Sequence, residues 1–187
     1  MKILKPPSTT FFPVPAVMIT TLGKEGKPNI ITLAWAGVVN SEPPMIGIGV
    51  RPDRHSFQLL QETGEFVVNL PTASQVKQVD LCGVHSGTDV DKFQLTGLTP
   101  EPASKVKPPL IAQCPVNLEC IIRHTLPLGS HHLFVGEVVA VQVEQEFLDS
   151  HNLVDIAKMQ PLAYATPSYW GLSQPLGLYG FSKKDKQ

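Results

Sequence analysis

Residues 14–22 (VPAVMITTL) and 29–39 (NIITLAWAGVV) are two apolar, β-branched runs, and the polar segment 23–28 (GKEGKP) between them is rich in turn-forming residues. A strand, a turn and a second strand in this order are typical of an antiparallel hairpin. We therefore expect one strand over 14–22 and another over 29–39, paired with each other.

More strands are expected downstream, two short ones over residues 45–50 and 65–70 and two long ones over 115–125 and 132–145. In the strand at 45–50, Gly47 and Gly49 leave one side bare, which permits the close approach of a backbone or a ligand. Many short strands with few helices favour a mainly β protein, built as a closed or partly closed antiparallel barrel.

Two short helices are expected between the strands. Asp53 is placed to cap a helix that runs through Leu60 and ends at Gly64. Thr72 and Gln75 have the spacing of a capping box, which predicts a second helix over about 73–81.

The segment 83–111 has no sustained periodicity and predicts a long loop, with one helical turn near Asp91–Phe93. Loops of this length in a compact domain are usually functional. Aromatic residues and glycines alternate over 164–181. The tail is expected to cross to a partner subunit, to cover the site or to pack on its own barrel.

The chain has 187 residues, of which 42% are hydrophobic, and its formal net charge is -1. This length and balance predict a single domain over 1–187 with a loop-rich C-terminal extension over about 150–187. Near-neutral charge argues against nucleic-acid binding. No apolar run is long enough for a signal peptide or a membrane span, so a cytoplasmic protein is expected. The cysteines Cys82, Cys114 and Cys120 have no CxxC spacing and indicate reduced thiols rather than a metal site.

The segment Arg51-Pro-Asp-Arg54-His55-Ser56 combines guanidinium groups, a hydroxyl and the expected start of a helix. Such a combination suits a phosphate. The alternative is a solvated loop in which Asp53 only caps the helix.

Three more clusters carry polar or aromatic groups. The first surrounds Trp35 with small and polar residues from Asn29 to Ser41, which suits a flat ring lying against backbone or a Trp in the core. The second is 86–93 (SGTDVDKF), which is either a binding loop or an ordinary turn with a capped helix. In the third, 129–137 (GSHHLFVGE), His131 is a proton donor, a stacking platform or a structural residue.

Six motifs follow one another from about Pro13 to Val143: Asn29-x-x-Thr32-x-Ala34-Trp35-x-Gly37, Pro43-Pro44, Arg51-x-x-Arg54-His55-Ser56, Glu65-Phe-Val-Val-Asn69-Leu70, Ser86-Gly87-x-x-x-Asp91-Lys92-Phe93 and Gly129-x-His131-x-Leu-Phe134-Val-Gly136-Glu-Val138. In this order they resemble the flavin reductase-like family, the FMN-binding split barrels, and within it the flavoredoxin-type branch. The resemblance implies a homodimeric, antiparallel, Greek-key-like split β-barrel that binds FMN without a covalent bond.

The resemblance also implies roles for individual residues. The strand over 32–37 would line the isoalloxazine and ribityl groups, the segment from Arg51 to Ser56 would hold the ribityl and phosphate, and His131 would lie near a nicotinamide. Ser130 replaces the aspartate of the family's Gly-Asp-His pattern, so the match here is weaker than in the N-terminal half. The expected FMN-binding residues are Asn29, Thr32, Ala34, Trp35, Ala36, Gly37, Arg51, Arg54, His55, Ser56, Ser86 and Lys92.

The implied function is that of an oxidoreductase that passes electrons from NAD(P)H to bound or free flavin or to another acceptor. Two alternatives remain at this point. One is a flavoredoxin-like electron-transfer flavoprotein reduced by a protein partner. The other is a non-redox split barrel that binds a different planar or phosphorylated ligand.

Overall fold

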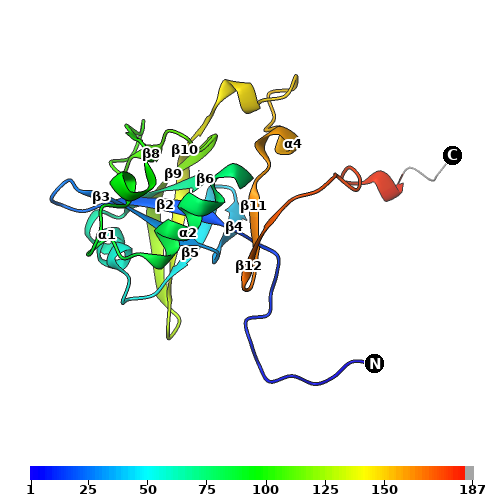
Figure 1. Ribbon diagram of the computed structural model, residues 1–187, viewed down its shortest axis with the longest axis horizontal. Coiled ribbons are helices and arrows are strands. Elements are labelled where there is room, and N and C mark those ends of the chain that lie inside the picture. The colour runs from blue at the N-terminus through cyan, green and yellow to red at the C-terminus, as the bar shows by residue number, and fades with distance from the viewer. Residues whose placement is uncertain (184–187) are drawn as a thin grey trace.

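The computed structural model describes residues 1–183, and a seven-stranded antiparallel sheet forms its body (Figure 1). The strand order is β3-β2-β6-β9-β10-β5-β4, and each neighbouring pair is antiparallel. The mainly β, antiparallel split-barrel architecture is thus confirmed. The strands are β2 (Val17–Leu22), β3 (Pro28–Leu33), β4 (Ala36–Ser41), β5 (Pro44–Val50), β6 (Glu65–Leu70), β9 (Val116–Pro127) and β10 (His132–Val143).

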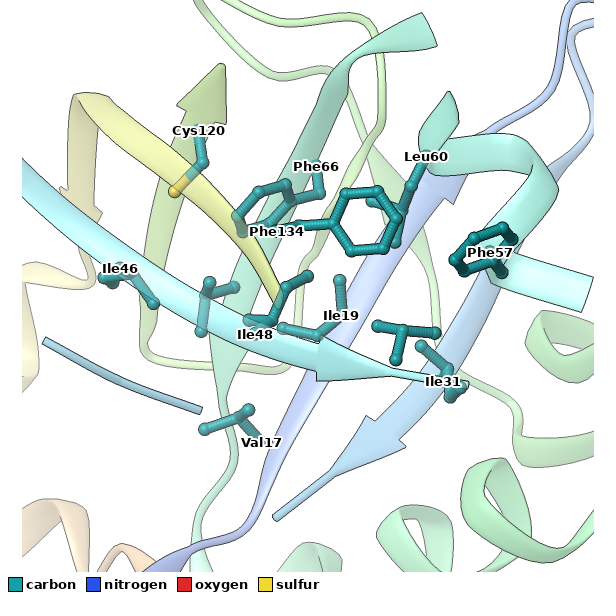
Figure 2. Close-up of a cluster of buried hydrophobic side chains, with 12 residues drawn as sticks. Val17, Ile19, Ile31, Ile46, Ile48, Phe57, Leu60, Phe66, Cys120 and Phe134 are labelled. Carbon is teal, nitrogen blue, oxygen red and sulfur yellow. The ribbon is translucent and has the colours of Figure 1, made fainter. Parts of the chain in front are cut away.

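The barrel interior is filled by alternate apolar residues of these strands and by one face of the helix α1 (His55–Thr63) (Figure 2). Phe66 and Phe134 are fully buried near its centre. Gly136 lies against Phe66: a Cβ atom built there would lie 2.6 Å from the Phe66 ring. Such close packing makes the barrel a rigid support for the loops at its ends.

The expected single strand over 29–39 is wrong. The chain bends at Ala34–Trp35, so β3 pairs with β2 while β4 pairs with β5. Gly49 in β5 donates its backbone N–H to the Trp35 carbonyl at 2.8 Å, which fixes the bend. An uninterrupted apolar run does not indicate that the chain changes its pairing strand from β2 to β5.

The expected strand over 14–22 is also divided. Its first residues form β1 (Val14–Pro15), which pairs with β11 (Leu162–Ala165) in a separate sheet of order β1-β11-β12. The third strand of that sheet is β12 (Ser168–Gly171). The C-terminal part of the chain is therefore anchored by β1 before it runs away from the barrel (Figure 1).

Helix α1 ends at Gly64, as expected, in a left-handed conformation with φ of 68°. Its predicted cap is wrong, because Arg54 rather than Asp53 is the N-cap residue. The backbone N–H of Arg54 donates to the Arg51 carbonyl at 3.1 Å, and this turn delays the start of the helix.

The second predicted helix begins as a 3-10 turn, η1 (Ala73–Gln75), and continues as α2 (Val76–Val84). In the long segment 83–111, the expected helical turn is α3 (Lys92–Thr96), capped by the Asp91 carboxylate. The remaining elements are β7 (Pro100–Glu101), β8 (Leu110–Ile111), η2 (Gln145–Phe147), α4 (Ile156–Met159) and η3 (Phe181–Lys183).

Within residues 1–183 no helix has the length and apolar character needed to cross a bilayer. The same residues contain no group of three or more His, Cys, Asp or Glu side chains arranged to hold a metal ion. Residues 184–187 of the expected C-terminal extension lie outside the described part of the chain.

Candidate functional site

A cavity of about 460 Å³ lies where β3 ends, where β5 leads into α1, and where α2 leads into α3. All the expected site residues except Ala36 and Gly37 line it, although they come from four separate stretches of sequence. These lining residues are Asn29, Thr32, Ala34, Trp35, Arg51, Arg54, His55, Ser56, Ser86, Lys92 and His131.

Lys92 is a buried cation in the wall of this cavity, with 5% of its surface exposed. Its ammonium donates a hydrogen bond to the Cys82 carbonyl at 2.7 Å, and no carboxylate of residues 1–183 forms an ion pair with it. Burial lowers the pKa of Lys92 to about 8; the Cys82 thiol opposes this shift and Arg54 adds to it. A buried charge without a counter-ion is costly, so this position favours an anionic ligand.

The start of α1 lies beside this lysine's cavity and contributes Arg54, His55 and Ser56. Arg54 lies 3.8 Å from the Asp53 carboxylate, and its side chain is 54% exposed. Because α1 has no side-chain cap, its first backbone N–H groups add positive partial charge at this end of the cavity.

Ser56 is 1% exposed, and Asn29 is 6% exposed. The Asn29 amide donates a hydrogen bond to the Ser56 hydroxyl oxygen at 2.8 Å. These two residues come from β3 and α1, so the pair joins the strand to the helix at the cavity wall.

Two aromatic rings also line the cavity. The rings of Trp35 and His131 have centroids 4.1 Å apart and are tilted by 41°. Burial and the positive charge of Arg51 lower the pKa of His131, so its imidazole is neutral at pH 7. Ser130 lies 2.9 Å from His131 Nδ1, which holds the ring in place.

Thr32 directs its hydroxyl proton to the Val79 carbonyl at 2.5 Å, which leaves the oxygen as an acceptor. Gly83 in α2 packs beside Thr32: a Cβ at Gly83 would lie 3.4 Å from the Thr32 Cβ. The helix α2 therefore covers the side of the cavity formed by β3.

Ala36 and Gly37 do not line the cavity. They line a neighbouring apolar groove of about 480 Å³, which shares Trp35, Gly49 and His131 with it. The bend at Ala34–Trp35 is the reason, because it carries the residues that follow onto the far side of Trp35.

Three lining residues were not predicted from the sequence, namely Gly83, Val84 and His85, whereas Gly87 and Asp89 belong to the candidate binding loop over 86–93. These three residues follow the middle of α2, where the apolar pattern indicates only packing. The motif that starts at Ser86 comes directly after them, and its immediate neighbours could have been included on that ground.

The site thus combines two cationic side chains, Lys92 and Arg54, with two aromatic ones, Trp35 and His131. The cationic pair suits a phosphate, and the aromatic pair suits a planar ring.

Residues 9–173 match the model of the family described as "Flavin reductase like domain". Flavoredoxin of Desulfovibrio vulgaris (Miyazaki F) has a similar structure, with a TM-score of 0.92 and 30% identity over 98% of this chain and 100% of that one. A flavoredoxin from Methanosarcina acetivorans gives a TM-score of 0.89 with 34% identity, covering 98% of each chain. An uncharacterized protein of Archaeoglobus fulgidus is 37% identical over 123 residues, which are 66% of this chain and 70% of that protein.

Proposed function

The chain belongs to the flavin reductase like domain family, and on this premise we propose that it is an FMN-binding oxidoreductase that takes electrons from NAD(P)H. The bound flavin would supply the redox chemistry, and the protein would supply binding, orientation and electrostatics. Its acceptor would be free flavin or another oxidant.

The observation that carries the proposal is the buried ammonium of Lys92, which has one hydrogen bond and no ion pair among residues 1–183. A phosphate monoester would satisfy its remaining N–H donors and provide the missing negative charge. Arg54 and the uncapped start of α1 support the same position for the phosphate.

The aromatic pair Trp35 and His131 supports a planar ring in the same cavity. Trp35 is 48% exposed, so one part of its indole is free to cover a ligand. Because the proposed role is binding and orientation, the proposal requires no acid–base pair from the chain. His131, held by Ser130, would limit access to the ring from the side of the groove.

The source of the electrons has two candidates. The two solved relatives described as flavoredoxins are 30% and 34% identical over nearly the whole chain, which favours electron transfer from a protein as the second function. A hydroxyl at Ser130 lacks the charge of an aspartate beside His131, which also weakens the argument for a nicotinamide at this position.

An anaerobic visible spectrum of the FMN-loaded protein, recorded before and after addition of NADH or NADPH, separates these functions. Rapid bleaching of the flavin absorbance would support the reductase. Persistence of the absorbance, followed by bleaching with a reduced ferredoxin-like protein, would support the electron-transfer flavoprotein. A protein that takes up no FMN would overturn both.

We also propose that the chain forms a homodimer through the face of β4. Val38 is 80% exposed and Val39 is 52% exposed on this edge strand, and Leu128 beside them is 64% exposed. A contiguous patch of exposed apolar side chains usually marks an interaction surface. Light scattering should give twice the chain mass for the wild type and the mass of one chain for Val38→Lys with Val39→Lys. A single chain mass for the wild type would contradict the dimer.

A further inference from the structure

Asn29 lies behind Ser56 in the cavity wall and is almost completely buried. Its side-chain nitrogen donates to the Ser56 hydroxyl oxygen at 2.8 Å. A hydroxyl group has one proton and two lone pairs, so Ser56 keeps its own proton for a different acceptor. The direction of that proton therefore depends on which end of the Asn29 amide faces Ser56.

Gly87 holds the amide in this orientation from the other side. A Cβ atom at Gly87 would lie 2.2 Å from the Asn29 side-chain oxygen and 2.8 Å from a carbon of the His55 ring. The backbone of Gly87 is thus packed against the amide oxygen, where its Cα–H groups suit an oxygen better than an NH₂ group. Any side chain at position 87 would push Asn29 away.

The neighbouring strand β2 does not restrain the Asn29 amide. Thr21 is opposite Asn29 in the β2–β3 register, but its buried hydroxyl has no hydrogen-bond partner within residues 1–183. The structure therefore gives Asn29 two restraints, the hydrogen bond to Ser56 and the contact with Gly87.

We propose that Asn29 is a positioning residue, held by Gly87, that commits the Ser56 hydroxyl proton to the cavity. The inference rests on the proposed function and deepens it. A phosphate dianion offers only acceptors, so a wall with Ser56, Lys92 and backbone N–H groups facing inward as donors is matched to it. With the amide reversed, Ser56 would donate to Asn29 and turn a lone pair toward the anion.

A double-mutant cycle tests this role through the affinity for FMN. Ser56→Ala removes the donor and should raise the Kd for FMN about tenfold, and Asn29→Ala should raise it several-fold. The double variant should bind like Ser56→Ala alone, because Asn29 acts through Ser56. Thr21→Val is the matched control and should leave the Kd unchanged. The proposal would be overturned if the Kd for FMN of the double variant rose by the product of the two single-variant increases. An unchanged Kd for Asn29→Ala would also overturn it.

A measurement without ligand separates this inference from the proposed function. In the ¹⁵N-labelled, FMN-free protein, the side-chain amide protons of Asn29 should exchange slowly with solvent. Ser56→Ala and Gly87→Ala should both speed that exchange, while Thr21→Val should not. Fast exchange in the wild type would overturn the positioning role, whatever the protein binds. Slow exchange in a protein that takes up no FMN would preserve the restraint on Asn29 and overturn the proposed function.

Discussion

The ammonium nitrogen of Lys92 lies 2.7 Å from the carbonyl oxygen of Cys82, in a side chain that is 5% exposed. This hydrogen bond holds the ammonium in the cavity wall but leaves its charge without a counter-ion among residues 1–183. The relationship makes Lys92 the part of the site that gains most from a phosphate.

Lys92→Met should weaken FMN binding by about 1.5–3 kcal/mol, the usual worth of a charge-assisted hydrogen bond. The same change should leave the stability of the FMN-free protein nearly unchanged. It removes the hydrogen bond to the Cys82 carbonyl, but it also removes an uncompensated buried charge and keeps much of the apolar stem. Titrations followed by flavin fluorescence and thermal melts measure the two effects. Arg54→Ala is the comparison variant. Its loss of affinity for FMN should be smaller, because the Arg54 side chain is 54% exposed. Equal affinities of wild type and Lys92→Met would remove Lys92 from the site.

The affinity for FMN should fall as the pH rises above about 8. Burial lowers the pKa of Lys92 to about 8, so the ammonium that attracts the phosphate is lost above that pH. The phosphate itself is already a dianion there, because its second pKa is near 6, as in other phosphate monoesters. From pH 6.5 to 9.5, the Kd of the wild type for FMN should rise toward that of Lys92→Met. The Kd of Lys92→Met should not change over this pH range. A flat profile in the wild type would contradict this role for the ammonium.

Trp35 should report ligand binding by its fluorescence. The indole lines the cavity, whereas Trp170 in β12 does not. Addition of FMN should therefore quench the tryptophan fluorescence, and most of this quenching should be lost in Trp35→Phe. The matched variant Trp170→Phe should retain most of the quenching. Quenching that persists in Trp35→Phe and is lost in Trp170→Phe would place the ring of the ligand away from Trp35.

His131→Ala should change the rate of NADH oxidation more than it changes the affinity for FMN. Its imidazole lies at the border between the cavity and the apolar groove and is neutral at pH 7, so it offers no charge to the phosphate. Steady-state rates and a flavin titration separate the two effects. His124→Ala, an exposed position of β9, is the control. An unaltered rate would assign His131 a structural role.

Gly136→Ala should destabilise the barrel by about 2 kcal/mol, because overpacking a well-filled core costs that order of free energy. The new methyl group would lie 2.6 Å from the Phe66 ring and 3.0 Å from the Cys120 Cβ. At Gly37, by contrast, a Cβ atom meets nothing within 4 Å, so Gly37→Ala should cost less than about 0.5 kcal/mol. Chemical denaturation of both variants measures the difference. Equal stabilities would contradict the packing at Gly136.

Much of the fold could be predicted because its strands are marked by local apolar runs and turn residues. The two long strands β9 and β10 are examples, and so is the helix end at Gly64. The bend at Ala34–Trp35 could not be predicted, because it depends on tertiary pairing of β4 with β5. The cap at Arg54 was missed because an Asp usually outranks an Arg at that position, but the turn from Arg51 decides it.

The polar half of the candidate site was foreseen from the residue types of 51–56 and from the motif that contains Lys92. Ala36 and Gly37 were misplaced by the same bend that divided the strand. Gly83 and His85 were missed as lining residues because their place in the wall depends on how α2 and α3 pack over β3.

A parallel titration of the purified protein with FMN and with riboflavin, which lacks the phosphate, tests whether the cavity binds a flavin through its phosphate. We expect saturable binding of FMN at one molecule per chain and at least about tenfold weaker binding of riboflavin, the ratio expected when charged hydrogen bonds are lost. Equal affinity for both ligands would contradict the role of Lys92 and of the start of α1. No binding of either would show that the cavity serves a different ligand.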